Sequence, residues 1–193
     1  GIAVTNSAYA NSGVTQRVRL VHTQEINYTL DTPTKQIGEV LTELTNGTGA
    51  FSGVATLRNT YGADLVSFWM EGDGGGGGGN GGCGVAWLQQ TVSNAFAPNG
   101  YSVLINFLCA VDNQSFPHEM GHNMGLLHAN GLACVDGTAK VALSDTCGEG
   151  VEYGDPFSTM GGDQGFFDGS DVHFLSPLYD SSELAHLGWL DAD

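Results

Sequence analysis

The stretch HEMGHNMGLLH at 118–128 places three histidines and one glutamate within eleven residues. His118 and His122 are four positions apart, so on a helix their imidazoles lie on one face, one turn apart. Two imidazoles in that arrangement can bind the same zinc ion. Glu119 lies about 100° further around such a helix. It therefore sits beside the ion, where a carboxylate can take a proton from a water molecule.

A catalytic zinc site commonly has three protein ligands and keeps a fourth position for water. His128 is the candidate for the third ligand, although it lies six residues past His122 and cannot reach the same ion from a continuing helix. Gly125 can adopt the left-handed conformation that ends a helix and turns the chain. The sequence therefore predicts three zinc ligands and Glu119 as the general base. The remaining histidines lack such spacing and are expected to be structural: His22, His173 and His186.

Several segments are expected to position this motif. Hydrophobic periodicity predicts strands over 17–29, 63–70, 84–88 and 101–108, a helix from 31–33 to 46, and a shorter helix over about 52–61. SFPHEMGHNMGLL should form the helix that carries the histidines, with Ser115 or Asp112 near its cap and Pro117 in its first turn. The run EGDGGGGGGNGGCG at 71–84 predicts a mobile surface loop, because glycine loses the most backbone entropy on ordering.

Length and charge limit the class of protein. The chain of 193 residues fits one domain, and 41% of its residues are hydrophobic. With 5 basic and 21 acidic residues its formal net charge is −16, which argues against nucleic acid as a partner. No apolar run approaches the roughly 20 residues that span a bilayer, so we do not expect an integral membrane protein.

The cysteines predict disulfides and an oxidising environment. Four cysteines without a C-x-x-C pair allow three disulfide pairings, of which Cys83–Cys109 with Cys134–Cys147 is the most local. Because the chain begins at Gly1 without an initiator methionine or a signal segment, we expect a signal or pro-segment to have been removed. Both features favour a secreted, extracellular protein.

Two motifs resemble a known family. HEMGHNMGLLH resembles the extended zinc signature of the metzincin metalloendopeptidases, and FSTMGG at 157–162 resembles their Met-turn, about 30 residues downstream. The resemblance implies that Met160 forms an apolar floor beneath the ligands without binding the ion. YGDPFSTMG and the terminal LGWL are most similar to the reprolysin-like and gametolysin-like secreted proteases. Ala129 stands where reprolysins carry an aspartate, and Gly162 stands where astacins and serralysins carry a tyrosine near the metal, so no tyrosine ligand is assigned.

The family resemblance implies an α+β metzincin fold for a single catalytic domain over 1–193. An upper subdomain of about 1–128 would hold a twisted mixed β-sheet with helices, including the zinc helix. A small irregular lower subdomain of about 129–193 would hold the Met-turn and end in a helix near 180–189. The zinc ion would lie in the cleft between the two subdomains.

The resemblance also implies where the substrate binds, and acidic loop residues offer positions for a second cation. An extended substrate would pair with an edge strand made by Gly84, Val85, Ala86 and Trp87. Phe166 and Phe167, after the Met-turn, could line the pocket for the side chain that follows the cut, although core packing explains them equally well. The glycine run next to the edge strand could gate the cleft. Calcium could bind at D-G-S-D over 168–171, or at Glu71 and Asp73.

These features predict a secreted, monomeric, zinc-dependent endopeptidase that acts on proteins or peptides. Water would attack the scissile carbonyl, with Glu119 accepting the proton and passing it to the leaving amine. One alternative is a zinc-containing extracellular binding module without activity, and another is a zinc hydrolase of non-peptide amides. A carboxylate beside an open coordination position argues against the inactive module, because a purely structural zinc site does not need one.

Overall fold

The computed structural model forms two compact units, Gly1–Asn6 with Gln16–Leu126, and Ser7–Thr15 with Leu127–Asp193. Each unit is considered by itself below. The structure describes residues 1–29, 35–71, 83–105, 110–111, 114–132, 135–136, 139–140, 150–155, 158–161, 166–167, 172–173 and 178–189. The prediction of a single catalytic domain over 1–193 stays a prediction.

A small mixed sheet forms the centre of the first unit. Its strands are β1 (Val66–Met70), β2 (Gly84–Ala86) and β3 (Tyr101–Ile105), in the order β1-β3-β2. β3 runs parallel to β1 and antiparallel to β2. Every residue of β3 is buried, as expected for the central strand of a covered sheet. The α+β class and the mixed sheet are therefore confirmed, and β1, which lies within the strand predicted over 63–70, is half-buried.

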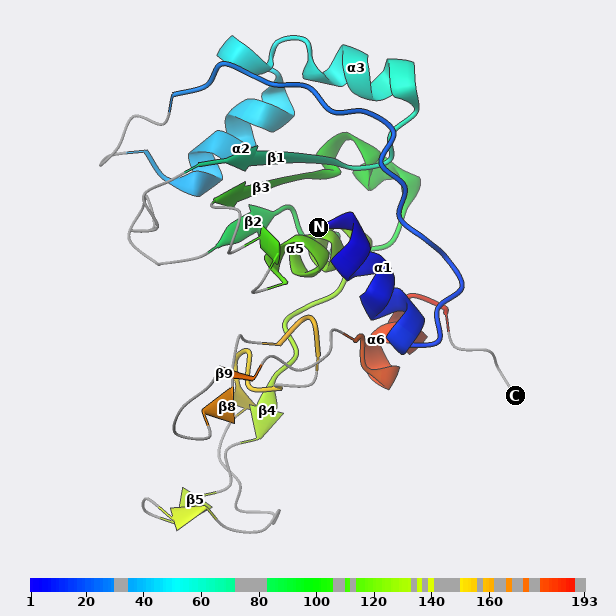
Figure 1. Ribbon diagram of the computed structural model, residues 1–193, viewed down its shortest axis with the longest axis vertical. Coiled ribbons are helices and arrows are strands. Elements are labelled where there is room, and N and C mark those ends of the chain that lie inside the picture. The colour runs from blue at the N-terminus through cyan, green and yellow to red at the C-terminus, as the bar shows by residue number, and fades with distance from the viewer. Residues whose placement is uncertain are drawn as a thin grey trace. The chain divides into compact units, whose positions relative to one another are not determined.

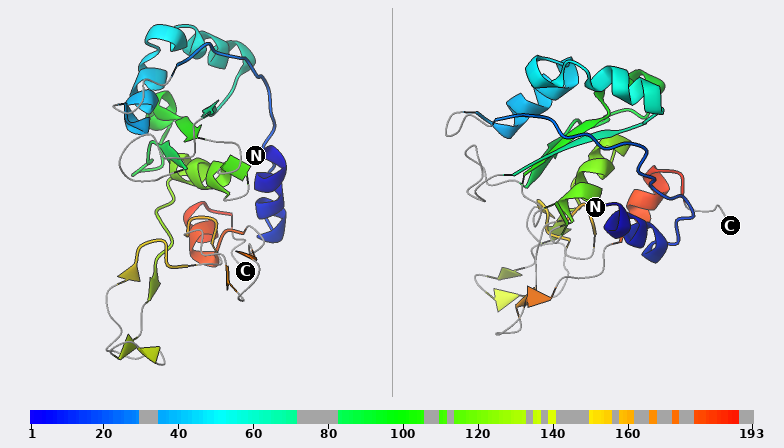
Figure 2. Two further views of the ribbon diagram at one scale, coloured as in Figure 1. Left: turned by 60° about the vertical axis from the view of Figure 1, so that its left-hand side comes forward. Right: turned by 45° about the horizontal axis from the view of Figure 1, so that its top comes forward.

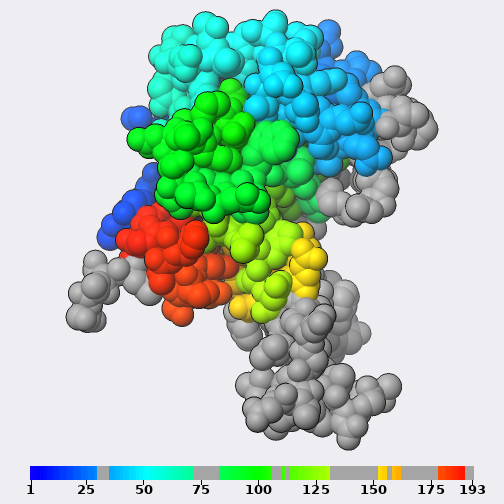
Figure 3. Space-filling model, turned by 180° about the vertical axis from the view of Figure 1, so that it is seen from behind, coloured from blue at the N-terminus to red at the C-terminus, as the bar shows by residue number. Residues whose placement is uncertain are grey.

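Helices cover the two faces of this sheet (Figure 1). α2 (Ile37–Asn46) and α3 (Val54–Tyr61) lie on one side, with the short η1 (Gly49–Phe51) between them, and α5 (Ser115–Met124) lies on the other. The additional views give the same layering (Figure 2). α2 and α5 both contact β2 and β3. In the space-filling view the light-blue α2 and the cyan α3 lie beside the green segment that contains η2 (Asn94–Asn99) (Figure 3).

α2 has the apolar spacing and the end that the sequence predicts, but the predicted start at 31–33 is wrong, because the helix begins at Ile37 after the extended Gln36. Its apolar positions recur three and four residues apart and bury Val40, Leu41 and Leu44 against the sheet. Gln36 and Glu39 form a capping box at its start, and Gly47 ends it in the left-handed conformation. Burial of these side chains, with Phe51 and Val103, forms the first core cluster. A second cluster joins the sheet to α5 through Leu104, Ala110, Phe116 and Met120.

The N-terminal segment differs from the prediction. Residues 17–29 contain no strand, so the strand predicted there is wrong. The side-chain amide of Asn6 takes the place of a neighbouring strand: its Nδ2 donates to the Val18 carbonyl at 3.0 Å, and its Oδ1 accepts from the Val18 amide at 2.8 Å. A helix that the pattern did not predict, α1 (Ile2–Asn11), precedes this segment. β-branched residues and asparagine favour a helix only weakly, so packing of Ala8 and Tyr9 decides its conformation.

The second unit contains short strand pairs and one helix. β4 (Gly131–Leu132) pairs with β7 (Gly150–Val151), β5 (Val135–Asp136) with β6 (Ala139–Lys140), and β8 (Phe166–Phe167) with β9 (Val172–His173), all antiparallel. The helix α6 (Ser181–His186) confirms the helix expected near 180–189. Asp180 caps it by accepting from the amides of Ser182 and Glu183. The rings of Tyr179 and Trp189 both pack on Tyr9, with centroids 5.7 Å and 5.1 Å away.

Several predictions fall on residues outside the described ranges. They concern the glycine run over 72–82, the calcium positions Asp73 and 168–171, Gly162, and three of the four cysteines, Cys109, Cys134 and Cys147. Cys83 is disulfide-bonded, but the pairing stays a prediction. Within the described part of the chain, no helix has the length and apolarity needed to span a membrane.

Candidate metal centre

α5 carries His118 and His122 on successive turns. Their rings lie edge to face, with centroids 4.7 Å apart and planes at 90°. The helix begins at Ser115 after Gln114, whose φ of 57° is left-handed and whose side chain does not cap the helix. Ser115 is thus a helical residue and not the cap that the sequence suggested, while Asp112 lies outside the described residues. Pro117 lies in the first turn as predicted, where its missing N–H costs nothing.

The C-terminal end of α5 turns the chain at Gly125, as the sequence predicts. Gly125 has a φ of 102°. Its N–H donates to the His122 carbonyl at 3.0 Å, and the Leu126 N–H donates to the Gly121 carbonyl at 2.9 Å. This pair of hydrogen bonds is a Schellman motif. The same turn brings the Leu126 carbonyl to 2.8 Å from Nδ1 of His122. A carbonyl only accepts, so Nδ1 carries the proton and Nε2 keeps its lone pair.

The chain beyond this turn brings the third histidine to the other two. Each of His118, His122 and His128 offers a ring nitrogen, and the three nitrogens lie within 4.8 Å of one another. Nδ1 of His128 lies 2.7 Å from Oε1 of Glu152. The ring nitrogens of the three predicted histidines therefore lie close together. In His122 and His128 the hydrogen bond at Nδ1 leaves Nε2 as the nitrogen that can bind an ion.

Glu119 is buried next to the start of β2. Its side chain is 6% exposed, and burial raises the pKa of its carboxyl to about 8. A β-carbon at Gly84 would lie 2.8 Å from Cγ and Oε1 of Glu119 and 2.7 Å from Cδ2 of Leu104. Real β-carbons do not approach other atoms so closely, so only glycine at residue 84 leaves Glu119 in place.

β2 is an edge strand of the three-stranded sheet. Gly84, Val85 and Ala86 pair with β3, and among the described strands nothing pairs with their opposite side. The segment that follows is fixed to α5, because the Gln89 amide donates to the His122 carbonyl at 3.0 Å. Nδ2 of the buried Asn123 also donates to the Trp87 carbonyl at 2.8 Å. The free strand edge is thus anchored to the helix turn that bears His122.

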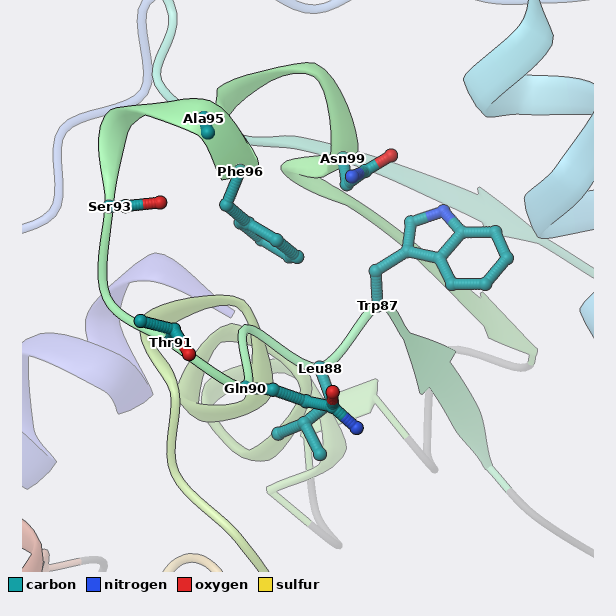
Figure 4. A pocket seen from close by; sticks show the side chains of 8 residues that line it. All are labelled: Trp87, Leu88, Gln90, Thr91, Ser93, Ala95, Phe96 and Asn99. Carbon is teal, nitrogen blue, oxygen red and sulfur yellow. The ribbon is translucent and has the colours of Figure 1, made fainter.

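A cavity of about 500 Å³ lies just beyond the end of β2 (Figure 4). Phe96 projects into it from η2, and Trp87 borders it from the end of β2. The indole N–H of Trp87 donates to Oγ1 of Thr45 at 2.8 Å, which holds the ring in position. Among the described residues that line it, none carries a charge: Trp87, Leu88, Gln90, Thr91, Ser93, Ala95, Phe96 and Asn99.

The turn that contains Met160 is hydrogen-bonded to the residue after the third histidine. Met160 is fully buried. The Ala129 N–H donates to the Met160 carbonyl at 2.9 Å, and the Ala129 carbonyl accepts from the Asp155 N–H at 3.2 Å. The Met160 N–H in turn donates to Oγ of Ser158 at 2.9 Å. Main-chain bonds therefore hold this turn beside the segment of His128 without an aspartate at residue 129.

α6 supports the same turn through Glu183. The Ser158 hydroxyl donates to Oε1 of Glu183, and the Asp180 N–H donates to Oε2 at 2.7 Å. Both the N–H and the hydroxyl of Thr159 donate to the Leu178 carbonyl, at 2.7 Å and 2.8 Å. Burial raises the pKa of the Glu183 carboxyl to about 7. Folding therefore favours the protonated form of the Glu183 carboxyl, which supports this turn.

We expect the free energy of unfolding to fall as the pH rises from about 4.5 to about 7. Between the ordinary pKa of 4.5 and the folded value of about 7, the folded protein keeps a proton at Glu183 that the unfolded chain has lost. Glu183→Gln should remove this part of the pH dependence. Urea unfolding of both proteins at pH 5 and pH 8 measures it. An equal loss of stability in the variant and the parent would contradict this assignment.

Other predicted site residues are placed only in part. Phe166 and Phe167 form β8, but the described structure gives their backbone alone, so both readings of these side chains stay predictions. His22 stacks on Tyr61 with ring centroids 4.0 Å apart. His186 is exposed in the last turn of α6.

Sequence reasoning missed two neighbours of His128. Glu152 accepts from its Nδ1, and the Tyr153 ring lies over it with centroids 3.8 Å apart. They are 24 and 25 residues further along the chain, and no spacing rule joins them to the histidine motif. Only the β4–β7 pairing, which begins shortly after His128, returns the chain to it.

Comparison with known proteins places this site in a family. The family model described as metallo-peptidase family M12B, reprolysin-like, matches residues 1–161, which include all three histidines, Glu119 and Met160. This chain belongs to that family. The M12B chain is also similar to a peptidyl-Asp metalloendopeptidase of Pseudomonas aeruginosa, at 37% identity over 132 residues that make up 66% of this chain and 21% of that protein.

A solved structure titled "Structure of a chaperone-substrate complex" matches 66% of the M12B chain and 19% of its own, with 26% identity and a TM-score of 0.46. The M12B chain thus spans about a fifth of the length of the proteins it matches.

Proposed function

We propose that this M12B domain is a zinc-dependent endopeptidase that uses Glu119 as its general base. The observation that carries the proposal is the convergence of three histidine nitrogens within 4.8 Å, two of them on the helix that also holds the buried carboxyl of Glu119. Nitrogens bound tetrahedrally at about 2.0–2.1 Å from one ion are about 3.4 Å apart. The three rings therefore need only small rotations to share an ion, and a set of neutral imidazoles suits zinc.

The residues have separate roles in this proposal. A zinc ion held by His118, His122 and His128 would supply a Lewis acid, lower the pKa of a water molecule and favour the ionised form of Glu119. Glu119 accepts the proton of the attacking water and later donates it to the leaving amine. Gly84 leaves the space that this carboxylate occupies. Met160 would form an apolar floor of the site without contributing a ligand, as the family resemblance implies.

The free edge of β2 supports an extended peptide as substrate. A peptide strand added to this edge would make main-chain hydrogen bonds beside Glu119, and antiparallel pairing is the more stable arrangement. Because Glu119 lies beside Gly84 at the start of β2, the far end of this strand would pair with residues that precede the reacting bond in an antiparallel peptide. The uncharged cavity beside Trp87 and Phe96 would then accept an apolar side chain on the N-terminal side of that bond.

The formal charge of −16 favours neutral or cationic peptides over acidic ones during association. We therefore do not propose for this chain the preference for aspartate that the name of the Pseudomonas relative indicates for that protein. The four cysteines, of which Cys83 is disulfide-bonded, support secretion.

Metal removal tests the proposal. We expect the purified chain to hydrolyse internally quenched peptides, to stop when a zinc chelator is added, and to resume when zinc but not calcium is returned. Serine-protease inhibitors should have no effect. Hydrolysis that continues in the chelator would contradict a zinc mechanism. Zinc binding without cleavage of any peptide in a broad library would favour the alternative of an inactive zinc-binding module.

A further inference from the structure

The ring of His128 forms a hydrogen bond with a side-chain carboxylate. Its Nδ1 lies 2.7 Å from Oε1 of Glu152. His122 is held differently, by the main-chain carbonyl of Leu126. A carboxylate accepts more strongly than a carbonyl. The hydrogen bond at His128 therefore depends on one side chain, whereas the bond at His122 depends on the fold of the turn.

The local fold explains how Glu152 reaches a histidine 24 residues earlier. Gly131 of β4 pairs with Val151 of β7 in antiparallel register. This pairing leaves Glu152 directly after the strand that returns toward His128. Tyr153 then adopts a left-handed φ of 61°, which is uncommon for a residue with a bulky side chain. Such a conformation persists only where contacts maintain it.

Tyr153 restricts the tilt of the same imidazole. Its ring centroid lies 3.8 Å from that of His128, with the planes inclined at 36°. Glu152 thus engages the edge of the imidazole at Nδ1, and Tyr153 covers its face. Glu152 and Tyr153 together fix the orientation of the imidazole and hence the direction of Nε2.

We propose that Glu152 is a positioning residue that orients His128 and keeps its proton on Nδ1, so that Nε2 is available to zinc. This inference rests on the proposed zinc site. A carboxylate that accepts from the far nitrogen of a histidine ligand fixes its tautomer and raises its basicity, and loss of such a partner typically weakens metal binding tenfold to a hundredfold. Because the Glu152 side chain is 68% exposed, we expect the lower end of this range.

The test measures zinc affinity of the full chain by competition with a chelator of known affinity. Glu152→Ala should raise the dissociation constant for zinc about tenfold. Glu152→Gln should raise it less, because the amide oxygen can still accept from Nδ1. Glu25→Gln is the matched control, since Glu25 is also an exposed glutamate and it should leave zinc affinity unchanged. Equal affinities for the parent and Glu152→Ala would overturn the inference.

A spectroscopic readout separates positioning from a general loss of structure. In nitrogen-15 NMR spectra of the metal-free parent, His128 should carry its proton on Nδ1. In metal-free Glu152→Ala the ring should populate both tautomers while the melting temperature stays near that of the parent. An unchanged tautomer in this variant would contradict the inference. If the parent itself binds no zinc, the proposed function fails instead, so the two failures are distinguishable.

Discussion

Glu119→Gln should lower kcat for peptide hydrolysis by roughly a hundredfold to ten-thousandfold, the usual contribution of a general base. Glutamine has almost the same shape, so it can occupy the space beside Gly84 that the carboxyl fills. It cannot accept the proton of the attacking water. We therefore expect the variant to bind zinc and to keep KM for the peptide close to that of the parent.

Steady-state kinetics with an internally quenched peptide, together with metal analysis of the same samples, measures this effect. Removal of a buried ionisable group also makes the variant at least as stable as the parent near neutral pH, because burial raises the pKa of Glu119 to about 8. Glu39→Gln is not a suitable control, since Glu39 belongs to the capping box of α2. Glu25→Gln is the matched control, because Glu25 is an exposed glutamate outside the site. Turnover near the parental rate in Glu119→Gln would remove the residue from the mechanism.

His122→Ala should abolish stoichiometric zinc binding. His122 is the middle member of the three histidines, and its Nδ1 is already committed to the Leu126 carbonyl. Two remaining imidazoles leave the ion with too few protein ligands. The parent should show one zinc ion per chain and a melting temperature that rises when zinc is added, because a ligand that binds the folded state stabilises it.

Metal analysis after dialysis and thermal unfolding with and without zinc measure both effects. The variant should contain no zinc at equilibrium, and its melting temperature should not respond to the ion. His186→Ala is the matched control, because His186 is exposed in α6 and should bind zinc like the parent. One tightly held ion in His122→Ala would show that zinc binds elsewhere.

The parts of the site that the sequence predicts are those fixed by local chain geometry. His118 and His122 meet because residues four apart stack on any helix. Gly125 ends that helix because no other residue adopts a φ of 102° without strain. The apolar spacing and the terminal glycine of α2 also predict this helix and its end, but its start at Ile37 was placed too early, at 31–33.

The parts that the sequence does not predict depend on contacts between distant residues. Asn6 satisfies both main-chain groups of Val18, which removes the need for a neighbouring strand over 17–29. Glu152 reaches His128 only because β4 and β7 pair. The contact between Gly84 and Glu119 joins a strand to a helix 35 positions later. Residue types and spacing do not encode such pairings in a single sequence.

The link between Ala129 and Met160 bears on how members of this family are recognised. Both hydrogen bonds of Ala129 use main-chain atoms, so almost any side chain at this position would preserve them. A search pattern that demands an aspartate directly after the third histidine would therefore pass over chains like this one. The main-chain hydrogen bonds of residue 129 to Met160 and Asp155 would be intact in such chains all the same.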